Sequence, residues 1–390
     1  MVTELHSGAQ VRPLVLSVNS AWNIVNFRAG LVRALIGSGY RIVALAPDDG
    51  HAQGVRDLGC EFIDLPMQSH GVNPWRDGAL FFRYLRILRG LRPSAFLGFT
   101  IKPNVYGSLA AHALDVPVIN NIAGLGAAFV RRDWLRFVAS SLYKVSLRSS
   151  TRVFFQNSDD QRLFLEEGLV REDRAQLLPG SGVDLAWFSL RPFQHGRERP
   201  VFLFVGRLLQ HKGVTEFVDA LRILRAQGVP CEARLLGSLD AANPSSIGAE
   251  KVRRWESEGL VRYLGFRHDV REAVGEADVV VLPSYVEGTP RSLLEAAAMG
   301  RPLVATDVPG SRDVIRDGEN GFLVPIRDSV ALAAVLRRMS EIGAERREAM
   351  GVASRRLVER NYDEQEVIAR YLALLGDLQE GQRTLLTSNE

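Results

Sequence analysis

Cysteine is scarce in this chain, and long apolar runs are missing from it. Its 390 residues include two cysteines, Cys60 and Cys231, which lie far apart and outside any C-x-x-C spacing. Such a pair provides neither a disulfide framework nor a zinc site, and it favours a reducing, cytoplasmic compartment. No run approaches the ~20 apolar residues of a membrane-spanning helix. Residues 1–10 are polar, so we do not expect a signal peptide.

An excess of charge of one sign is also missing from the chain as a whole. The net charge is +3 at pH 7, which by itself gives no reason to expect a nucleic-acid partner. The basic residues are nevertheless concentrated between positions 71 and 155, where twelve arginines and lysines face three aspartates. With 390 residues the chain is long enough for two domains, each with its own core.

Short apolar, β-branched runs alternate with helical patterns along the chain. Residues 13–19 and 41–46 predict two strands, separated by a polar and aromatic loop at 20–26 and a helix at 27–38. This order predicts a parallel sheet. The first loop lacks the G-x-G-x-x-G fingerprint of dinucleotide-binding domains. A polar, proline-bounded segment at 191–200 predicts a domain boundary.

The candidate chemistry is concentrated in one stretch of the second half. Residues 279–282 predict a buried strand, and residues 291–299 predict a helix with Thr289 as its N-cap. Glu287 then lies beyond the carboxyl end of the strand, and Glu295 lies about two turns along the helix. Open parallel sheets bind ligands at this end of their strands. Both acids can instead be ordinary solvated side chains.

The spacing Glu287-x7-Glu295 resembles the E-x7-E motif of retaining glycosyltransferases of the GT4 type. A second motif strengthens the resemblance. The run Gly206-Arg207-Leu-Leu-Gln-His-Lys212-Gly213 follows a predicted strand and resembles the diphosphate motif of that family. Two cations beside a helix N-terminus suit a diphosphate, since arginine binds phosphate oxygens bidentately and lysine adds a point charge.

The resemblance implies an α/β protein of the GT-B fold, with two Rossmann-like parallel-sheet domains that face a central cleft. We expect residues 1–190 to form an acceptor-binding domain, completed by a C-terminal helix at about 363–390. Residues 191–362 would form the domain that binds a nucleotide sugar.

The resemblance also implies a retaining transfer from a UDP-sugar, with no metal and no other cofactor. Arg207 and Lys212 would stabilise charge on the departing diphosphate, and Glu287 would contact the sugar. These three are the catalytic candidates, and Glu295 would bind the ribose. The donor-binding candidates are Gly206, Arg207, Lys212, Phe266, Arg267, Glu287, Gly288, Thr289, Arg291, Ser292 and Glu295.

Two loops of the first half resemble a narrower branch of the family. The sequences of residues 100–107 and 121–126 are similar to loops of the enzymes that transfer N-acetylated sugars to polyprenyl-diphosphate-linked acceptors in bacterial glycan assembly. Many family members place a histidine in the region of the first of these loops, where this chain has Lys102 and Asn104. That departure fits a transfer in which the leaving phosphate takes the acceptor proton. The acceptor and first-loop candidates are Asn19, Asn23, Lys102 and Asn104, each of which can instead be a turn, capping or surface residue.

The basic region of the first half carries aromatic residues as well. A basic helix with exposed aromatics can lie in a membrane interface, and each basic residue near anionic lipid contributes about 1 kcal/mol. We therefore expect a cytoplasmic protein attached peripherally to the inner membrane, although a solvated helix with core-facing aromatics is the alternative. The membrane candidates are Arg131, Arg132, Trp134, Arg136 and Phe137.

The expected partners are a nucleotide-sugar donor, a lipid-linked saccharide acceptor and the inner-membrane surface. No nucleic-acid-binding motif accompanies the basic region, so no nucleic acid is expected. Two rival functions remain open at this point. One is an isomerase of the same fold, of the UDP-N-acetylglucosamine 2-epimerase type, which would need acid/base carboxylates and no acceptor. The other is a catalytically inactive protein that binds nucleotide sugars.

Overall fold

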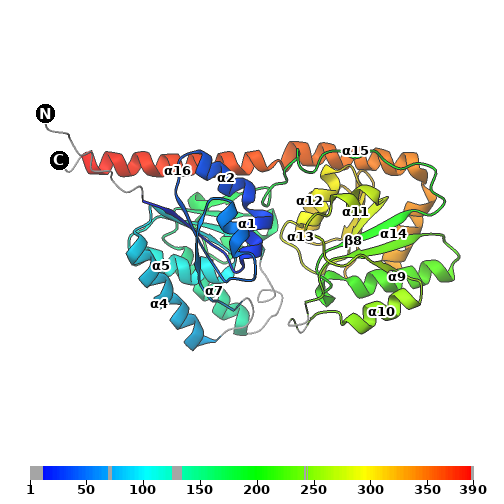
Figure 1. Ribbon diagram of the computed structural model, residues 1–390, viewed down its shortest axis with the longest axis horizontal. Coiled ribbons are helices and arrows are strands. Elements are labelled where there is room, and N and C mark those ends of the chain that lie inside the picture. Colours follow the sequence, from blue (N-terminus) through cyan, green and yellow to red (C-terminus); the bar gives the residue numbers. More distant parts are fainter. Residues whose placement is uncertain (1–11, 69–72, 125–133, 241–242, 244, 388–390) are drawn as a thin grey trace. The chain divides into compact units, whose positions relative to one another are not determined.

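The computed structural model describes residues 12–68, 73–124, 134–240, 243 and 245–387 (Figure 1). The chain divides into two compact units. The first unit comprises Met1–Leu178 and Val367–Glu390, and the second comprises Pro179–Glu366. Each unit is a parallel sheet covered by helices, as the alternation of strand and helix patterns predicts.

The sheet of the first unit has the strand order β3-β2-β1-β4-β5-β6-β7, with every described pair parallel. Its strands are β1 (Leu14–Ser17), β2 (Ile42–Ala46), β3 (Glu61–Asp64), β4 (Ala95–Phe99), β5 (Val118–Ile122), β6 (Arg152–Phe155) and β7 (Ala175–Leu177). The strands β1, β2, β4 and β5 are buried along their whole length. Burial on both faces explains why β2 and β4 read as continuous apolar runs, whereas β5 carries the buried polar residues Asn120 and Asn121.

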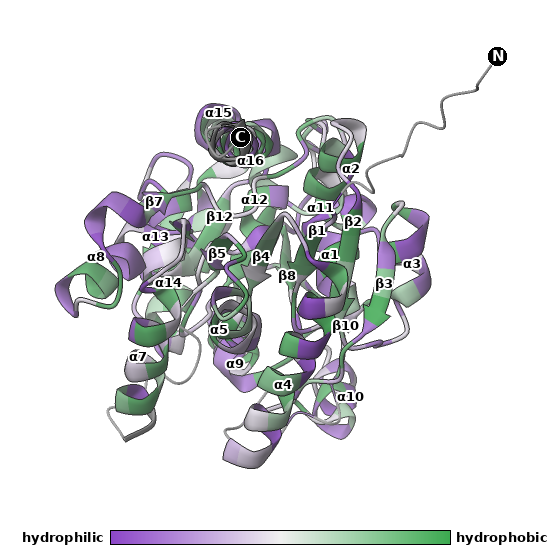
Figure 2. Cartoon of the chain, turned by 90° about the vertical axis from the view of Figure 1, so that its left-hand side faces the viewer, coloured by the Kyte–Doolittle hydropathy of each residue, from purple (hydrophilic) through white to green (hydrophobic). Residues whose placement is uncertain are grey.

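Helices cover both faces of this first sheet. The helices α1 (Ala21–Phe27), α2 (Ala29–Gly37) and α16 (Glu364–Thr387) supply one core cluster. The helices α4 (Pro74–Leu91) and α5 (Ser108–His112) supply a second, and α7 (Trp134–Leu147) and α8 (Ser158–Glu166) a third. The short α3 (Ala52–Asp57) precedes β3. In Figure 2 the strands β1 and β2 are mostly hydrophobic, whereas α4 carries bands of both colours.

The predicted loop at 20–26 is wrong, because these residues form helix α1. The Ser20 side chain accepts a hydrogen bond from the Asn23 N–H at 3.2 Å and caps the helix N-terminus. A break at Arg28 then separates α1 from α2, so the single helix predicted over 27–38 is two helices.

The second unit is a sheet in the order β10-β9-β8-β11-β12-β13, again with parallel pairs. Its strands are β8 (Val201–Val205), β9 (Glu232–Leu236), β10 (Arg262–Tyr263), β11 (Val279–Leu282), β12 (Leu303–Thr306) and β13 (Gly321–Val324). Its helices are α9 (Val214–Ala226), α10 (Ala249–Ser257), α11 (Arg271–Glu276), α12 (Arg291–Ala298), α13 (Pro309–Val314), α14 (Ser329–Glu341) and α15 (Gly343–Asn361). The strand predicted at 279–282 is confirmed residue for residue.

The division between the units differs from the boundary predicted at 190/191. Residues 179–190 belong to the second unit, because Val183 and Phe188 are buried in its core and Val183 forms a parallel bridge with Asp363. The segment that ends the second unit likewise extends to Glu366 rather than to 362.

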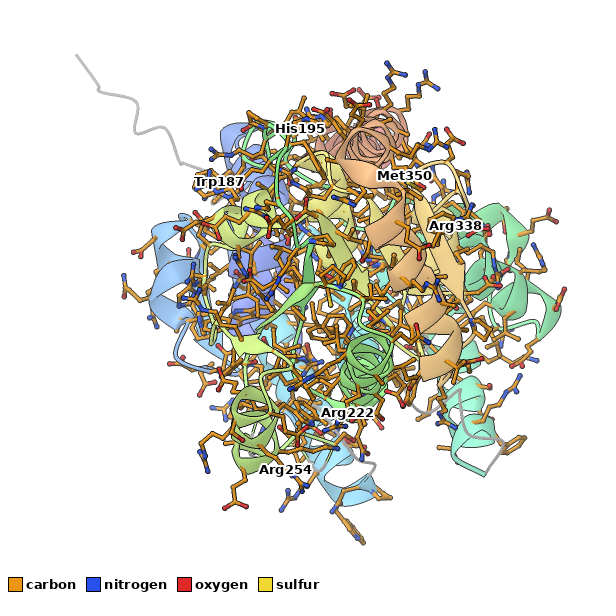
Figure 3. All side chains as sticks on the ribbon, turned by 90° about the vertical axis from the view of Figure 1, so that its right-hand side faces the viewer. Trp187, His195, Arg222, Arg254, Arg338 and Met350 are labelled. Carbon is orange, nitrogen blue, oxygen red and sulfur yellow. The ribbon has the colours of Figure 1, made fainter. Side chains whose placement is uncertain are left out.

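The polar segment at 191–200 lies on the second unit and is held there by specific contacts. The buried Arg301 guanidinium donates to the carbonyls of Arg191 and Pro192 at 3.2 and 2.9 Å. His195 contacts Glu348 at 3.0 Å, and the Arg271 guanidinium stacks 3.6 Å from the ring centroid of Trp187. Figure 3 labels both His195 and Trp187.

A buried polar cluster joins β4, β5 and the segments beside them in the first unit. The Asn120 side-chain amide donates to Asn104 Oδ1 at 3.0 Å and to Ser108 Oγ at 2.8 Å, and Asn120 Oδ1 accepts from Ser150 Oγ at 2.6 Å. Asn104 in turn donates to the Asn121 carbonyl at 2.8 Å. Because Asn104 and Asn120 are almost wholly buried, each depends on these partners for its hydrogen bonds.

Replacing Asn120 with alanine should therefore destabilise the first unit. We expect the free energy of unfolding to fall by about 3 kcal/mol, since three buried polar partners lose a hydrogen bond at once. Urea unfolding followed by circular dichroism measures the change. The matched control is Gln53→Ala, which removes an exposed amide that bonds Asp57 at 2.9 Å. An equal shift in both variants would contradict the role of the cluster.

Candidate active site

Three glycines stand just past the carboxyl ends of three neighbouring strands in the second unit. Gly206 follows β8, Gly237 follows β9 and Gly265 comes soon after β10. The Gly206 N–H donates to the Leu236 carbonyl at 3.0 Å, and the Gly237 N–H donates to the Gly265 carbonyl at 2.9 Å. A Cβ atom at Gly237 would lie 1.8 Å from the Gly206 carbonyl oxygen, so only glycine permits this approach. The loops after these strands are thus packed backbone to backbone.

The loop after β8 also contacts the loop after β11. The Tyr285 N–H donates to the His211 carbonyl at 2.8 Å. Gly213 has a left-handed φ of 72°, and a Cβ there would lie 1.9 Å from the Pro283 carbonyl oxygen. Two segments that are seventy residues apart in the sequence therefore lie side by side at the carboxyl edge of the sheet.

This contact brings two of the catalytic candidates together. The Lys212 ammonium lies 2.5 Å from a Glu287 carboxylate oxygen. The pair is largely shielded from solvent, with side-chain exposures of 19% for Lys212 and 10% for Glu287. Arg207, the third candidate, is exposed at the start of the same loop.

The second acid of the E-x7-E motif is also at this edge, on helix α12. Arg291 Nε donates to Glu295 at 3.1 Å, and Arg291 Nη1 donates to Ser181 Oγ at 3.1 Å and to the Gly182 carbonyl at 3.0 Å. Burial raises the pKa of Glu295 above its ordinary value, and the nearby Asp269 carboxylate adds to the rise. The Arg291 guanidinium opposes both effects.

The segment between the two acids is set by backbone geometry. Helix α12 begins at Arg291, with the extended Pro290 as its N-cap, so the predicted N-cap at Thr289 is wrong. A Cβ atom at Gly310 would lie 1.5 Å from the Gly288 carbonyl oxygen, which fixes the path of the loop against α13. Ser292 follows, half-buried in the first turn of the helix.

The loop after β10, which carries the donor-binding candidates Phe266 and Arg267, lies at the same edge. Phe266 is 47% exposed, and its ring meets His268 edge-on with the centroids 4.8 Å apart. The Arg267 guanidinium donates to Glu272 at 2.8 Å. Asp269, at the end of this loop, is close enough to Glu295 to influence its pKa. The structure therefore brings the candidates of the second unit to one sheet edge, as the sequence predicts.

Two family models match this chain. A glycosyl transferase 4-like domain matches residues 24–180, and a model for glycosyl transferases group 1 matches residues 199–341. The chain belongs to the GT4-type glycosyltransferases. The second match contains every donor-site candidate.

Curated relatives agree with this assignment. One is the N,N′-diacetylbacillosaminyl-diphospho-undecaprenol alpha-1,3-N-acetylgalactosaminyltransferase of Campylobacter jejuni, 28% identical over 368 residues, which span 90% of this chain and 95% of the relative. Another is the UDP-Gal:alpha-D-GlcNAc-diphosphoundecaprenol alpha-1,3-galactosyltransferase of Escherichia coli, 25% identical over 62% of this chain and 64% of the relative.

Solved structures show the GT-B fold for this glycosyltransferase. Anabaena Alr3699/HepE in complex with UDP and glucose matches with a TM-score of 0.76 and 18% identity, over 94% of this chain and 100% of that one. A glycosyltransferase from Rickettsia africae matches with a TM-score of 0.73 and 16% identity, over 94% of this chain and 99% of that one.

The acceptor candidates of the first unit have different surroundings from those expected. Asn104 is buried and its amide is engaged in the polar cluster, which gives it a structural role instead of an acceptor contact. The Lys102 ammonium donates to Asp77 at 2.6 Å, and Asp77 is itself buried. Asn23 lies in the first turn of α1, and Asn19 precedes its cap. The structure thus explains Lys102 and Asn104 by contacts within the unit.

The membrane candidates are described only in part. Arg131 and Arg132 lie outside the described residues, as does the side chain of Trp134. Arg136 pairs with Glu167, whereas Phe137 is 76% exposed on α7. No helix among the described residues is both long and apolar enough to cross a membrane.

Sequence reasoning missed several groups at this edge. Tyr285 Oη donates to Glu216 at 2.5 Å, and the Arg327 guanidinium lies 4.6 Å from the Tyr285 ring centroid. Burial, together with the Glu216 carboxylate, raises the pKa of Tyr285 to about 12. Tyr285 lies between the predicted strand at 279–282 and Glu287, so the sequence places it near the site. Nothing in the sequence indicates that Tyr285 contacts Glu216, or that Arg291 contacts Ser181.

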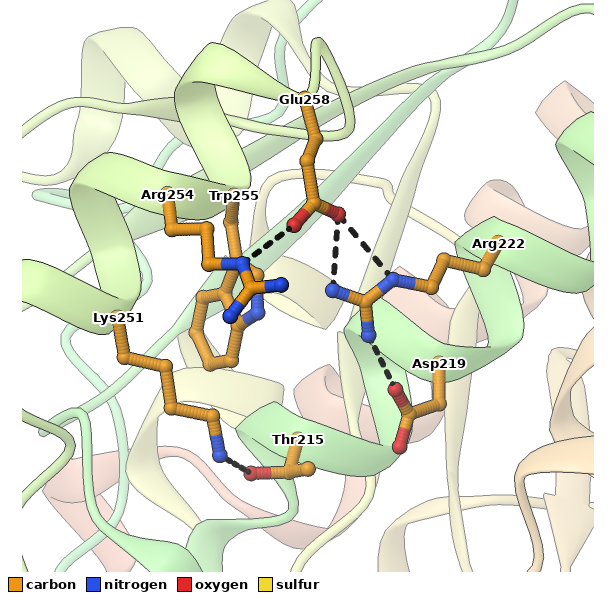
Figure 4. Close-up of a pocket in the computed structure, with 7 residues that line it drawn as sticks. All are labelled: Thr215, Asp219, Arg222, Lys251, Arg254, Trp255 and Glu258. Carbon is orange, nitrogen blue, oxygen red and sulfur yellow. Dashed lines mark hydrogen bonds and ion pairs between the residues drawn. The ribbon is translucent and has the colours of Figure 1, made fainter.

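A separate hollow of the second unit lies between α9 and α10 (Figure 4). Its basic side chains all have partners within the hollow. Lys251 donates to Thr215 at 3.4 Å, and Arg222 and Arg254 both bond Glu258, at 2.9 and 3.2 Å. Figure 4 shows Arg222 and Arg254 turned toward the Glu258 carboxylate and Lys251 turned toward the Thr215 hydroxyl.

Replacing Arg207 or Lys212 with alanine should lower turnover by orders of magnitude while leaving the fold intact. Each change removes a cation that would stabilise the leaving diphosphate, and electrostatic stabilisation of this kind is worth about 10²–10³ in rate per group. Steady-state UDP release measures the effect. Lys251→Ala removes a lysine from the hollow between α9 and α10, and it should leave turnover within about twofold. Unchanged turnover in both test variants would contradict the assignment.

Proposed function

We propose that this glycosyltransferase moves an N-acetylhexosamine from a UDP-sugar to a polyprenyl-diphosphate-linked saccharide, with retention of configuration and without a metal. The observation that carries the proposal is the convergence of Arg207, Lys212, Glu287 and Glu295 at the carboxyl edge of one sheet. The names of the Campylobacter and Escherichia relatives support the donor and acceptor classes.

The proposed donor site divides its work among these four side chains. Arg207 and Lys212 would face the diphosphate and offset the charge that develops on it as the glycosidic bond breaks. With two cations in that position, the site has a countercharge without a divalent ion. Glu295 would accept hydrogen bonds from the ribose hydroxyls, and Glu287 would accept from a sugar hydroxyl.

The chemistry at the sugar follows from the same groups. Lys212 and Glu287 are bonded to each other in this structure, so a diphosphate that takes the ammonium would release the carboxylate for the sugar. In the proposed retaining transfer the leaving phosphate oxygen takes the acceptor proton. The acceptor therefore needs no separate protein base, which agrees with a first-unit loop that carries Lys102 and Asn104 and no histidine between residues 100 and 107.

The proposed acceptor is attached to a lipid, so we also propose that the first unit binds the inner-membrane surface from the cytoplasm. Two helices of the unit carry large exposed aromatics, which are Trp75 (90% exposed) and Phe82 (67%) on α4 and Phe137 on α7. On α4 the arginines 76, 83, 86 and 89 are also exposed. Aromatics among arginines suit an anionic lipid surface, where each cation contributes about 1 kcal/mol.

The function is tested by incubating the enzyme with UDP-GalNAc, UDP-GlcNAc or UDP-galactose and an undecaprenyl-diphosphate-linked monosaccharide. We expect acceptor-dependent UDP release, fastest with an N-acetylated donor, and an α-linked product by NMR. EDTA should leave the rate unchanged. A UDP-sugar that epimerises without acceptor would contradict transfer, and loss of activity in EDTA would contradict the metal-independent mechanism.

The membrane surface is tested by vesicle flotation. The variant Trp75→Glu/Phe82→Glu should lose at least about tenfold in binding to vesicles with 30% phosphatidylglycerol, because two apolar contacts are lost and two negative charges are added. Val330→Glu changes an exposed apolar residue of the second unit and should leave binding unchanged. Equal binding by the double variant and the wild type would exclude α4 as the membrane surface.

A further inference from the structure

One side chain of the donor site connects the E-x7-E helix to the segment through which the chain enters the second unit. Arg291 is the first residue of α12, and it bonds Glu295 one turn further along. Its other nitrogen bonds Ser181 Oγ and the Gly182 carbonyl. The guanidinium and the carboxylate are both mostly shielded, with side-chain exposures of 15% and 14%.

We propose that Arg291 is a positioning residue for the donor ribose. Its guanidinium keeps the Glu295 carboxylate charged and holds it at a fixed point relative to the Ser181 hydroxyl and the Gly182 carbonyl. The proposal rests on the proposed function, since it takes Glu295 to be the group that accepts from the ribose hydroxyls.

The anchor at Ser181 and Gly182 is rigid because the chain has no room to shift there. Gly182 has a left-handed φ of 69°, and a Cβ on it would lie 2.3 Å from Glu364 Cα. A Cβ on Gly180 would lie 2.9 Å from the Thr289 side chain, and the Val183 N–H donates to the Tyr362 carbonyl at 2.8 Å. A guanidinium that holds this segment and Glu295 at once leaves the carboxylate little freedom, and such preorganisation improves binding.

The charge of Glu295 depends on the same contact. Burial and the Asp269 carboxylate, from the loop after β10, both disfavour the ionised form. Arg271 holds Asp269 at 2.6 Å and so belongs to the same electrostatic surroundings. Arg291 is the cation bonded to Glu295 itself. Without it the pKa of Glu295 should rise further, so that more of the acid would be neutral at low pH.

The test compares the affinity of the full-length enzyme for UDP with its affinity for 2′,3′-dideoxy-UDP, by calorimetry at pH 6.0 and 8.5. Wild type should prefer UDP by about tenfold or more at both values, as hydrogen bonds to a charged group imply. In Arg291→Gln the preference should fall severalfold at both values and further at pH 6.0 than at pH 8.5, because a higher pKa leaves more of the acid neutral at the lower pH and the neutral acid is a weaker acceptor. A wild-type preference in this variant at both pH values would overturn the proposal.

A matched control separates positioning from general loosening of the segment. Arg355 on α15 donates to the carbonyls of Phe188 and Ala298 at 2.9 and 2.7 Å, and it does not bond Glu295. Arg355→Gln therefore weakens the attachment of the same incoming segment and should retain the preference for UDP. If Arg355→Gln and Arg291→Gln lost the preference for UDP equally, Arg291 would act only by stabilising the incoming segment.

A second variant serves if Arg291→Gln does not fold. Arg291→Lys keeps the positive charge but cannot fork to Ser181 and Gly182. Arg291→Lys should lower the preference for UDP severalfold, and the lowered preference should not depend on pH. If this variant kept the full wild-type preference, the positioning role of Arg291 would be overturned. Failure of the proposed function looks different. Wild type would then fail to bind UDP, or would bind both nucleotides equally, and the role of Arg291 would fall together with the assigned donor.

Discussion

The carbonyl oxygen of Gly206 occupies the place where a side chain at position 237 would begin, and the Pro283 carbonyl occupies the corresponding place at Gly213. These two approaches remove the space that side chains would need between the loops after β8, β9 and β11. Cations and acids from separate loops can then meet, as Lys212 and Glu287 do. A larger residue at either glycine would force the loops apart.

Much of the donor edge could be predicted because its determinants are local in the sequence. The apolar run at 279–282 fixes β11, and strand–loop–helix order then places Glu287 and Glu295 at the edge of the sheet. The helix begins at Arg291 as predicted, although the extended Pro290 and not Thr289 is its N-cap. The prediction is therefore right about the element and wrong about the residue that caps it.

The rest depended on contacts between distant residues. The predicted boundary places residues 179–190 in the first domain, yet Val183 and Phe188 complete the core of the second unit and so move the boundary. Asn104 looks like a loop residue available to a substrate, but partners at positions 120 and 121 bury its amide. Residue types alone do not reveal such partners. The contact of Arg291 with Ser181 spans 110 residues and is equally invisible in the sequence.

The parallel bridge between Val183 and Asp363 has a consequence for the evolution of the molecule. It places the entrance and the exit of the second unit beside each other, so that residues 179–366 form one uninterrupted stretch with neighbouring ends. A segment of this kind can be replaced as a whole domain, because its two ends join the rest of the chain at neighbouring points. A lineage could thus exchange its second unit by recombination while its first unit stayed the same.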